Sequence, residues 1–356
     1  MLEELIDINV INALGRYMDK TNKNKAPTAY EVAKLANVSP STVSRYFNRT
    51  SYVSHDKTEK IEDAIRSLGY KPQVYVDKLA KTRSMTIGVL VQNPDSPYTS
   101  SILIDMEKVL AEHGYSLLMS VNSWQARLVS YSLDYLLKSD VDAIIIISGN
   151  VDKKLIFKCA EKIPIVAVGY NIVGDNIQSI ALDNTMGGYL ATLHLIQLGH
   201  VNIAHLKGLP NHEDAISRFH GYQKALSEAG IVFKKKLVLE GDFSIKTGYE
   251  RTVELIQSQV YFSAIFAAND LTAYGAIKAL HDHGYKVPED ISVIGFDDLP
   301  TSTYFTPSLT TLRQPLDEIG AISAQCILKL LCGEVEMVRL PPISLIARES
   351  TKSRYR

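Results

Sequence analysis

Short apolar runs, mostly of β-branched residues, alternate with amphipathic helical patterns through most of this 356-residue chain. Residues 142–148 (DAIIIIS) and 163–169 (IPIVAVG), for example, each suit one buried strand. Strands that are apolar on both faces and are separated by helices indicate parallel sheets with helices on both sides. The expected strands are 86–92, 116–121, 142–148, 163–169, 202–207, 263–268 and 292–296, and the expected helices are 102–113, 127–138, 152–161, 186–198, 213–229, 245–258, 270–283 and 316–332.

This alternating region is longer than one open sheet usually is, so we expect an α/β core of two doubly wound parallel-sheet lobes. The core is predicted to cover residues 85–351. Lobe one should comprise about 85–185 and 315–342, and lobe two about 186–312 and 343–351, because the last helix and strand return to complete the lobes.

Residues 30–48 (YEVAKLANVSPSTVSRYFN) predict two short helices joined by a tight turn. Val32, Leu35 and Ala36 have the spacing of one helix face, and residues 37–39 break that pattern. This arrangement is typical of a helix-turn-helix, whose second helix enters the major groove of DNA.

The second of these helices should begin at Pro40, because Ser39 is a good N-cap and proline suits the first helical position. Val43 and Phe47 would pack against the rest of the head. The remaining faces can meet base edges or phosphates through Ser41, Thr42, Ser44, Arg45 and Asn48.

A third helix is expected from Ser54 to Leu68, ending at Gly69, and the head is therefore predicted to be all α-helical. Pro72 then favours an extended chain. The predicted divisions before the core are an N-terminal extension (1–25), a helix-turn-helix DNA-binding domain (26–71) and a hinge segment (72–84).

Charge is distributed unevenly along the chain, whose formal net charge is −1. Residues 27–83 hold ten Lys and Arg against six Asp and Glu, or +4, which leaves −5 elsewhere. A basic head on an acidic body argues against nucleic acid bound along the whole chain and favours one local DNA-binding module.

Other features place the chain in the cytoplasm, associated with the nucleoid when bound to DNA. No apolar run approaches the ~20 residues of a membrane span, and the acidic N-terminus does not resemble a signal peptide. The three cysteines form no CxxC pair and are expected to be free thiols. We expect neither a cofactor nor a metal, and interpret His281 to His283 as a polar helix end.

Polar residues recur just after the predicted strands, where ligands bind in open parallel sheets. Carboxylates, amides and a guanidinium suit a polyhydroxyl ligand, and two aromatic rings could stack on a sugar. Each Asp or Asn could instead be a simple helix N-cap, and only their recurrence favours a site. These residues are Asn93 to Tyr98, Ser148, Asp183 and Asn184, Asn269 and Asp270, and Asp297 and Asp298, with Arg218 near the start of a helix and Tyr98 and Phe243 as the two rings.

These motifs resemble the lactose-repressor/galactose-repressor (LacI/GalR) family of bacterial transcription regulators over about residues 28–350. In the head the matches are Tyr30, Val32, Ala33, Ala36, Val38-Ser39, Thr42-Val43-Ser44-Arg45, Asn48, Val53-Ser54, Thr58, Ile61, Ala64, Leu68-Gly69-Tyr70 and Pro72. In the body they are Asp183-Asn184, His194-Leu195-Ile196, Leu198-Gly199-His200, Arg218, Gly221-Tyr222, Asn269-Asp270, Gly275, Ile294-Gly295-Phe296-Asp297-Asp298, Leu309-Thr310-Thr311-Leu312 and Gln314-Pro315.

The resemblance implies a periplasmic-binding-protein-like core and a homodimer that binds a near-palindromic operator under the control of a small effector, usually a sugar. It places Pro40, Ser41 and Arg45 at base edges, and Thr28, Ser44 and Asn48 near phosphates. The effector contacts that it implies are Tyr98, Asp183, Arg218, Phe243, Asn269 and Asp297. Leu79 would be the wedge inserted into the minor groove. The hinge departs from the family pattern at Gln73, Val76 and Asp77, and an acidic Asp77 near phosphates is unfavourable.

The resulting expectation is a repressor of a carbohydrate-utilisation operon that responds to a sugar or sugar phosphate. A purine or a phosphoprotein remains open as the effector. A sugar-binding transport protein would share the core but would lack the DNA-binding head. An enzyme is not expected, because GxSxG, P-loop and HExxH motifs are absent from the sequence.

Overall fold

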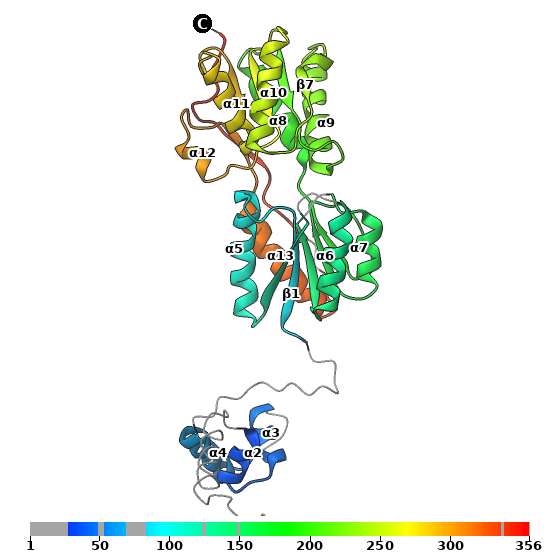
Figure 1. The fold of residues 1–356 in the computed structure, drawn as a ribbon, viewed down its shortest axis with the longest axis vertical. Coiled ribbons are helices and arrows are strands. Elements are labelled where there is room, and N and C mark those ends of the chain that lie inside the picture. Colours follow the sequence, from blue (N-terminus) through cyan, green and yellow to red (C-terminus); the bar gives the residue numbers. More distant parts are fainter. Residues whose placement is uncertain are drawn as a thin grey trace, which may run out of the picture. The chain divides into compact units, whose positions relative to one another are not determined.

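The computed structural model describes residues 28–48, 53–68, 83–122, 126–147, 150–335 and 338–355. The chain divides into two compact units, residues 1–82 and 83–356, which are described separately below (Figure 1). The predicted N-terminal extension and residues 72–82 of the predicted hinge lie outside the described residues, and so do Leu79 and Ser148.

The first unit is a three-helix head: α2 (Ala29–Leu35), α3 (Pro40–Asn48) and α4 (His55–Leu68). Thr28 and Glu31 form a capping box that starts α2. Asn37 adopts a left-handed conformation (φ 52°) and turns the chain toward α3, where Ser39 Oγ accepts from the Thr42 backbone N–H over 3.2 Å. The three helices share a core of Val32, Ala33, Ala36, Val43, Ile61 and Ala64.

Lobe one of the second unit is a parallel five-stranded sheet in the order β2-β1-β3-β4-β5. Helices α5 and α13 pack on one face and α6 and α7 on the other (Figure 1). The strands are β1 (Thr86–Val91), β2 (Ser116–Val121), β3 (Ala143–Ile147), β4 (Ile165–Val168) and β5 (Ile177–Ile180). The helices are α5 (Pro97–Glu112), α6 (Ala126–Lys138), α7 (Lys153–Ala160) and α13 (Leu316–Leu331).

Lobe two is a parallel four-stranded sheet in the order β7-β6-β8-β9. Helices α8 and α9 cover one face and α10 and α11 the other. The strands are β6 (Ile203–Leu206), β7 (Val238–Leu239), β8 (Ala264–Ala267) and β9 (Ser292–Ile294), and a 3₁₀ turn, η1 (Lys235–Leu237), precedes β7. The helices are α8 (Asn184–Gln197), α9 (Glu213–Glu228), α10 (Ile245–Gln257), α11 (Asp270–Asp282) and the short α12 (Thr301–Tyr304).

Helices α8 and α9 approach so closely that only glycine fits at their contact. A Cβ on Gly188 would lie 2.1 Å from the Arg218 carbonyl oxygen, and one on Gly221 would lie 2.1 Å from that of Thr185. The backbones touch because neither glycine has a side chain. This contact brings the N-terminus of α8 beside the first turns of α9.

The chain returns to lobe one after lobe two, as the sequence predicted for its last helix. Leu316, Ile319 and Ile327 of α13 lie in the lobe-one core. Strand β10 (Thr311–Arg313) precedes α13 and pairs in antiparallel fashion with β11 (Ser344–Ile346), which follows it. A carboxylate braces these return segments, because Asp298 accepts from Arg348 over 2.6 Å and from Arg313 over 3.1 Å.

The predicted alternation of strands and helices is confirmed, with boundaries that differ by a few residues. Helix α5 begins at Pro97 rather than at residue 102, because proline fits the first helical turn. The sequence missed β5, β7 and β10, which are two to four residues long. Runs this short carry too little periodicity to be recognised.

Candidate functional site

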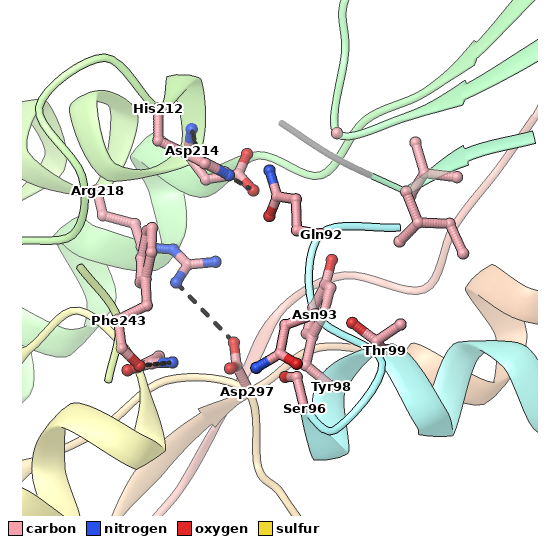
Figure 2. Close-up of a pocket in the computed structure, with 14 residues that line it drawn as sticks. Gln92, Asn93, Ser96, Tyr98, Thr99, His212, Asp214, Arg218, Phe243 and Asp297 are labelled. Atoms are coloured by element: carbon pink, nitrogen blue, oxygen red, sulfur yellow. Dashed lines mark hydrogen bonds and ion pairs between the residues drawn. The ribbon is translucent and has the colours of Figure 1, made fainter. Parts of the chain in front are cut away.

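A cavity lies between the two lobes (Figure 2). The centres of water molecules can occupy about 90 Å³ of it. Both lobes contribute, since residues after β1 and β4 form one wall and the starts of α9 and α11 form much of the other. The lining residues are Gln92, Asn93, Ser96, Tyr98, Thr99, Ile147, Val168, Gly169, His212, Asp214, Arg218, Phe243, Asn269 and Asp297.

Arg218 is the central cation of the lobe-two wall and is only 3% exposed. Its Nε donates to Asn184 Oδ1 over 2.8 Å, and its Nη1 donates to the Ala268 carbonyl over 2.6 Å. The guanidinium also lies 3.7 Å from the centre of the Phe296 ring. These contacts fix the plane of the guanidinium before any ligand arrives.

Asp297 lies opposite Arg218, with a carboxylate oxygen 3.9 Å from Nη1 (Figure 2). It adopts a positive φ of 117°, and Gln314 donates to its Oδ1 over 2.6 Å. Burial raises the pKa of Asp297 to about 8, although the Arg218 charge acts in the opposite direction. The carboxyl group is therefore mostly protonated at neutral pH.

Asp214 and His212 lie in the first part of α9 and its N-cap. Asn184 Nδ2 donates to Asp214 Oδ1 over 2.9 Å, and the Asp214 backbone N–H donates to His212 Nδ1 over 3.3 Å. Burial lowers the pKa of His212, so this imidazole is neutral at physiological pH.

Two aromatic rings border the cavity from different lobes: Tyr98 from lobe one and Phe243 from lobe two (Figure 2). Phe243 has a positive φ of 67°, and its carbonyl accepts from Asn269 Nδ2 over 3.1 Å. Asn269 also caps α11, because its Oδ1 accepts from the Thr272 backbone N–H over 2.9 Å. One asparagine thus serves as a helix cap and as part of the cavity wall.

The structure brings five of the predicted effector residues together and places a sixth, Asp183, outside the cavity lining. Tyr98, Arg218, Phe243, Asn269 and Asp297 line the cavity. Asp183 does not line it: this side chain is exposed and caps α8 by accepting from the Met186 backbone N–H over 2.8 Å. Ser148 lies outside the described residues.

Sequence reasoning missed several lining residues, including Gln92, His212 and Asp214. The only signal for Gln92 is its place at the end of β1. His212 and Asp214 begin a helix, so nothing in their pattern separates them from ordinary capping residues. Only the tertiary structure, which places the start of α9 at the cavity, distinguishes them.

On the head, the described side chains among the predicted DNA-binding residues lie on the exposed side of α3 and at the start of α2. Pro40, Ser41 and Arg45 are exposed, whereas Val43 of the same helix is buried. The Ser39 hydroxyl hydrogen-bonds both Ser41 Oγ and Thr42 Oγ1 over 2.8 Å. Thr28 is exposed at the α2 N-cap, and Ser44 and Asn48 belong to α3.

Within the residues that the structure describes, no helix is long and apolar enough to cross a bilayer. No group of three or more His, Cys, Asp or Glu side chains there could hold a metal ion.

Comparison with known proteins identifies both units. The family model described as "Bacterial regulatory proteins, lacI family" matches residues 28–73. The model described as "Periplasmic binding proteins and sugar binding domain of LacI family" matches residues 84–349.

Individual relatives agree with this result. The chain is 33% identical over 336 residues to the HTH-type transcriptional repressor PurR of Haemophilus influenzae, covering 92% of this chain and 99% of the relative. It is similar to a lac repressor dimer bound to operator and the anti-inducer ONPF (31% identity, TM-score 0.82, 92% and 100% covered). A complex of the regulator CelR with cellobiose is also similar (30% identity, TM-score 0.68, 91% and 99% covered).

The family models cover the helix-turn-helix head and the two-lobed core in the order in which they occur in the chain. Each relative aligns with both the head and the core over nearly its whole length. The chain therefore belongs to the LacI family of bacterial regulatory proteins and is a DNA-binding transcriptional repressor with an effector-binding core, not an enzyme.

Proposed function

We propose that the chain represses a carbohydrate-utilisation operon and that a small sugar in the cavity between the lobes controls its affinity for the operator. The observation that carries the effector class is the lining of the cavity. A fixed guanidinium, two carboxyl groups and amides from Gln92, Asn93 and Asn269 offer donors and acceptors, and Tyr98 and Phe243 offer ring faces. Directional polar groups beside aromatic faces suit a hydroxyl-rich ring.

A purine effector is the second candidate, because the PurR repressor of Haemophilus influenzae is 33% identical to this chain. The same two aromatic residues could stack on a purine base. A phosphoprotein partner remains a further alternative within the family. A thermal-shift screen separates small ligands, since a compound at 100-fold its Kd should stabilise the protein by roughly 2.7 kcal/mol.

The screen should compare cellobiose, D-ribose, glucose 6-phosphate and hypoxanthine. Stabilisation by either unmodified sugar supports the carbohydrate proposal. Stabilisation by hypoxanthine alone would replace it with the purine reading.

For DNA, we propose that α3 reads a near-palindromic operator through Pro40, Ser41, Thr42 and Arg45. Thr28, Ser44 and Asn48 would contact phosphates, and Leu79 would enter the minor groove. The exposed polar face of α3 supports this assignment. The predicted hinge, residues 72–84, would connect the head to the core.

Arg45→Ala tests the reading role directly. A bidentate arginine–guanine contact discriminates between bases by about 1–3 kcal/mol, so its loss should reduce the ratio of operator to mutated-operator affinity by roughly 5- to 150-fold. Lys34→Ala on α2 is a matched control that should leave the ratio unchanged. An unchanged ratio for Arg45→Ala in a gel-shift titration would remove Arg45 from the reading surface.

We further propose that the repressor is a cytoplasmic homodimer, associated with the nucleoid when it is bound to DNA. In lobe one, Ile104 of α5 is 67% exposed and Met119 of the edge strand β2 is 45% exposed. Exposed apolar side chains beside an unpaired strand edge favour a second copy as the covering partner. Ile104→Lys/Met119→Lys should shift the sedimentation coefficient from that of a dimer to that of a monomer.

A further inference from the structure

Asn184, the first residue of α8, uses both ends of its amide to hold two cavity-lining side chains in place. Its Oδ1 accepts from Arg218 Nε over 2.8 Å, and its Nδ2 donates to Asp214 Oδ1 over 2.9 Å. The side chain is buried, with only 6% of the residue exposed. A buried amide with both ends hydrogen-bonded has one favoured orientation, so it fixes its partners relative to each other.

The close packing of α8 and α9 places this amide. Gly188 and Gly221 allow the two helix backbones to touch, which sets the start of α8 beside the first turns of α9. The neighbouring Asp183 points away from this network and caps α8 in solvent. Of the neighbours Asp183 and Asn184, only Asn184 therefore contacts the residues of the site.

The network leaves one donor and one acceptor facing the cavity. No acceptor for Arg218 Nη2 occurs among the residues that the structure describes, and Figure 2 shows this end of the guanidinium directed into the cavity. On the acceptor side, Asp214 Oδ2 is 4.0 Å from His212 Nδ1, a nitrogen that already accepts from the Asp214 backbone N–H. Gly169 lies beside the same oxygen and, being glycine, places no side chain against it.

We propose that Asn184 is a positioning residue that presents Arg218 and Asp214 as a fixed donor–acceptor pair, and that this pair selects an uncharged ligand with a neighbouring acceptor and donor, such as a vicinal diol. The proposal rests on the effector site described under Proposed function. A diol can accept from Arg218 with one hydroxyl and donate to Asp214 with the other. A phosphate dianion has no proton to donate and meets the Asp214 carboxylate unfavourably.

An exchange of side chains tests the positioning role. Asn184→Ala removes both hydrogen bonds, and Asn184→Asp places two carboxylates against each other. The double variant Asn184→Asp/Asp214→Asn restores the pattern: the new carboxylate accepts from Arg218 and from the new amide, whose oxygen then faces the cavity. Gln197→Glu, at the exposed far end of α8, makes the same amide-to-carboxylate change as a control.

The first readout needs no ligand. In NMR spectra, the Arg218 Nε–H resonance is identified by its loss in Arg218→Lys. This proton should be protected from exchange with solvent in the unchanged protein, in Asn184→Asp and in the double variant. It should lose that protection in Asn184→Ala. Equal protection in Asn184→Ala would overturn the positioning role, whatever the effector proves to be.

The second readout is calorimetric titration with cellobiose, D-ribose and glucose 6-phosphate. For a sugar that binds the unchanged protein, each single substitution should weaken binding by about 10- to 100-fold, and the double variant should recover most of that loss. Failure of the double variant to recover affinity above either single variant would contradict the proposal. Binding of glucose 6-phosphate as tightly as the unmodified sugars would contradict the selection of an uncharged ligand.

These results separate the inference from the proposed function. If no sugar binds but the Nε–H resonance behaves as expected, the positioning role stands and the carbohydrate assignment fails. If a sugar binds equally well to the single variants and to Gln197→Glu, the carbohydrate assignment stands and the role of Asn184 is wrong.

Discussion

The two walls of the cavity are built differently. On the lobe-two wall, Arg218 and Asp297 are each less than 10% exposed. Arg218 donates to the buried Asn184, and Asp297 accepts from Gln314, just after the return strand β10. On the lobe-one wall, Asn93 is exposed in the loop between β1 and α5, and its Oδ1 accepts only from the backbone N–H two residues later, over 3.1 Å, among the described contacts.

This difference indicates how each wall would contribute to ligand binding. A wall that is already hydrogen-bonded loses little conformational entropy when a ligand binds, so it can supply most of the affinity and selectivity. An exposed loop side chain such as Asn93 can adapt as the lobes close. Substitutions of the buried lobe-two residues should therefore be costly, whereas a substitution of Asn93 should be milder.

The largest effect is expected for Arg218→Ala. It leaves Asn184 Oδ1 and the Ala268 carbonyl buried without their donor and removes the cation beside Asp297. Loss of one partner from a buried ionic network costs about 3–5 kcal/mol, so the melting temperature should fall and sugar binding should become undetectable by calorimetry. Arg251→Ala, which removes an exposed arginine of α10, should change neither.

Asp297→Asn should alter how stability depends on pH. The folded pKa of Asp297 is raised to about 8 from the ordinary value of 3.8, so between these values the folded chain holds a proton that the unfolded chain releases. Stability conferred by this proton is present at low pH and is lost as pH rises toward 8.

The substituted protein cannot titrate at this position. Relative to the unchanged protein, it should gain stability as pH rises from 5 to 8, measured by urea unfolding at each pH. Asp270, whose burial raises its pKa to about 6, is present in both proteins and cancels in the comparison. Parallel stability curves for the two proteins would show that the Asp297 pKa is ordinary.

A smaller effect is expected for Asn93→Ala on the lobe-one wall. Removing one adaptable hydrogen-bonding side chain should weaken sugar binding by about 3- to 10-fold and leave the melting temperature within about 1 °C. Asp95→Ala, in the same exposed loop but outside the cavity lining, is the matched control. A loss as large as that of Arg218→Ala would mean that the two walls contribute equally.

The smallest effect should come from the ion pair that joins the lobes. Lys153 of α7 in lobe one lies 2.6 Å from Glu213 of α9 in lobe two, and both side chains are about 40% exposed (44% and 39%). Exposed pairs contribute about 0.2–1 kcal/mol, so Lys153→Ala should change sugar affinity by less than about 5-fold. The double variant Lys153→Glu/Glu213→Lys should restore the sugar affinity. The difference in affinity between Lys153→Ala and the unchanged protein should shrink in high salt.

The sequence predicted the elements and chemistry that depend on local patterns. Buried β-branched runs identified the central strands, and Ser39-Pro40 identified the start of α3, because capping and strand burial are decided by neighbouring residues. The residues Arg218, Asn269 and Asp297 were also predicted, since positions after parallel strands converge at one edge of a sheet.

Tertiary structure alone decided which of several equivalent polar residues join the cavity network. Asp183 and Asn184 both follow a strand and begin a helix, yet the first caps α8 in solvent and the second is buried between Arg218 and Asp214. The same residue types suit both roles, because a carbonyl oxygen that accepts from a helix N–H accepts equally well from a guanidinium. The glycine contact between α8 and α9 settles the choice, and it joins residues more than thirty positions apart in the chain.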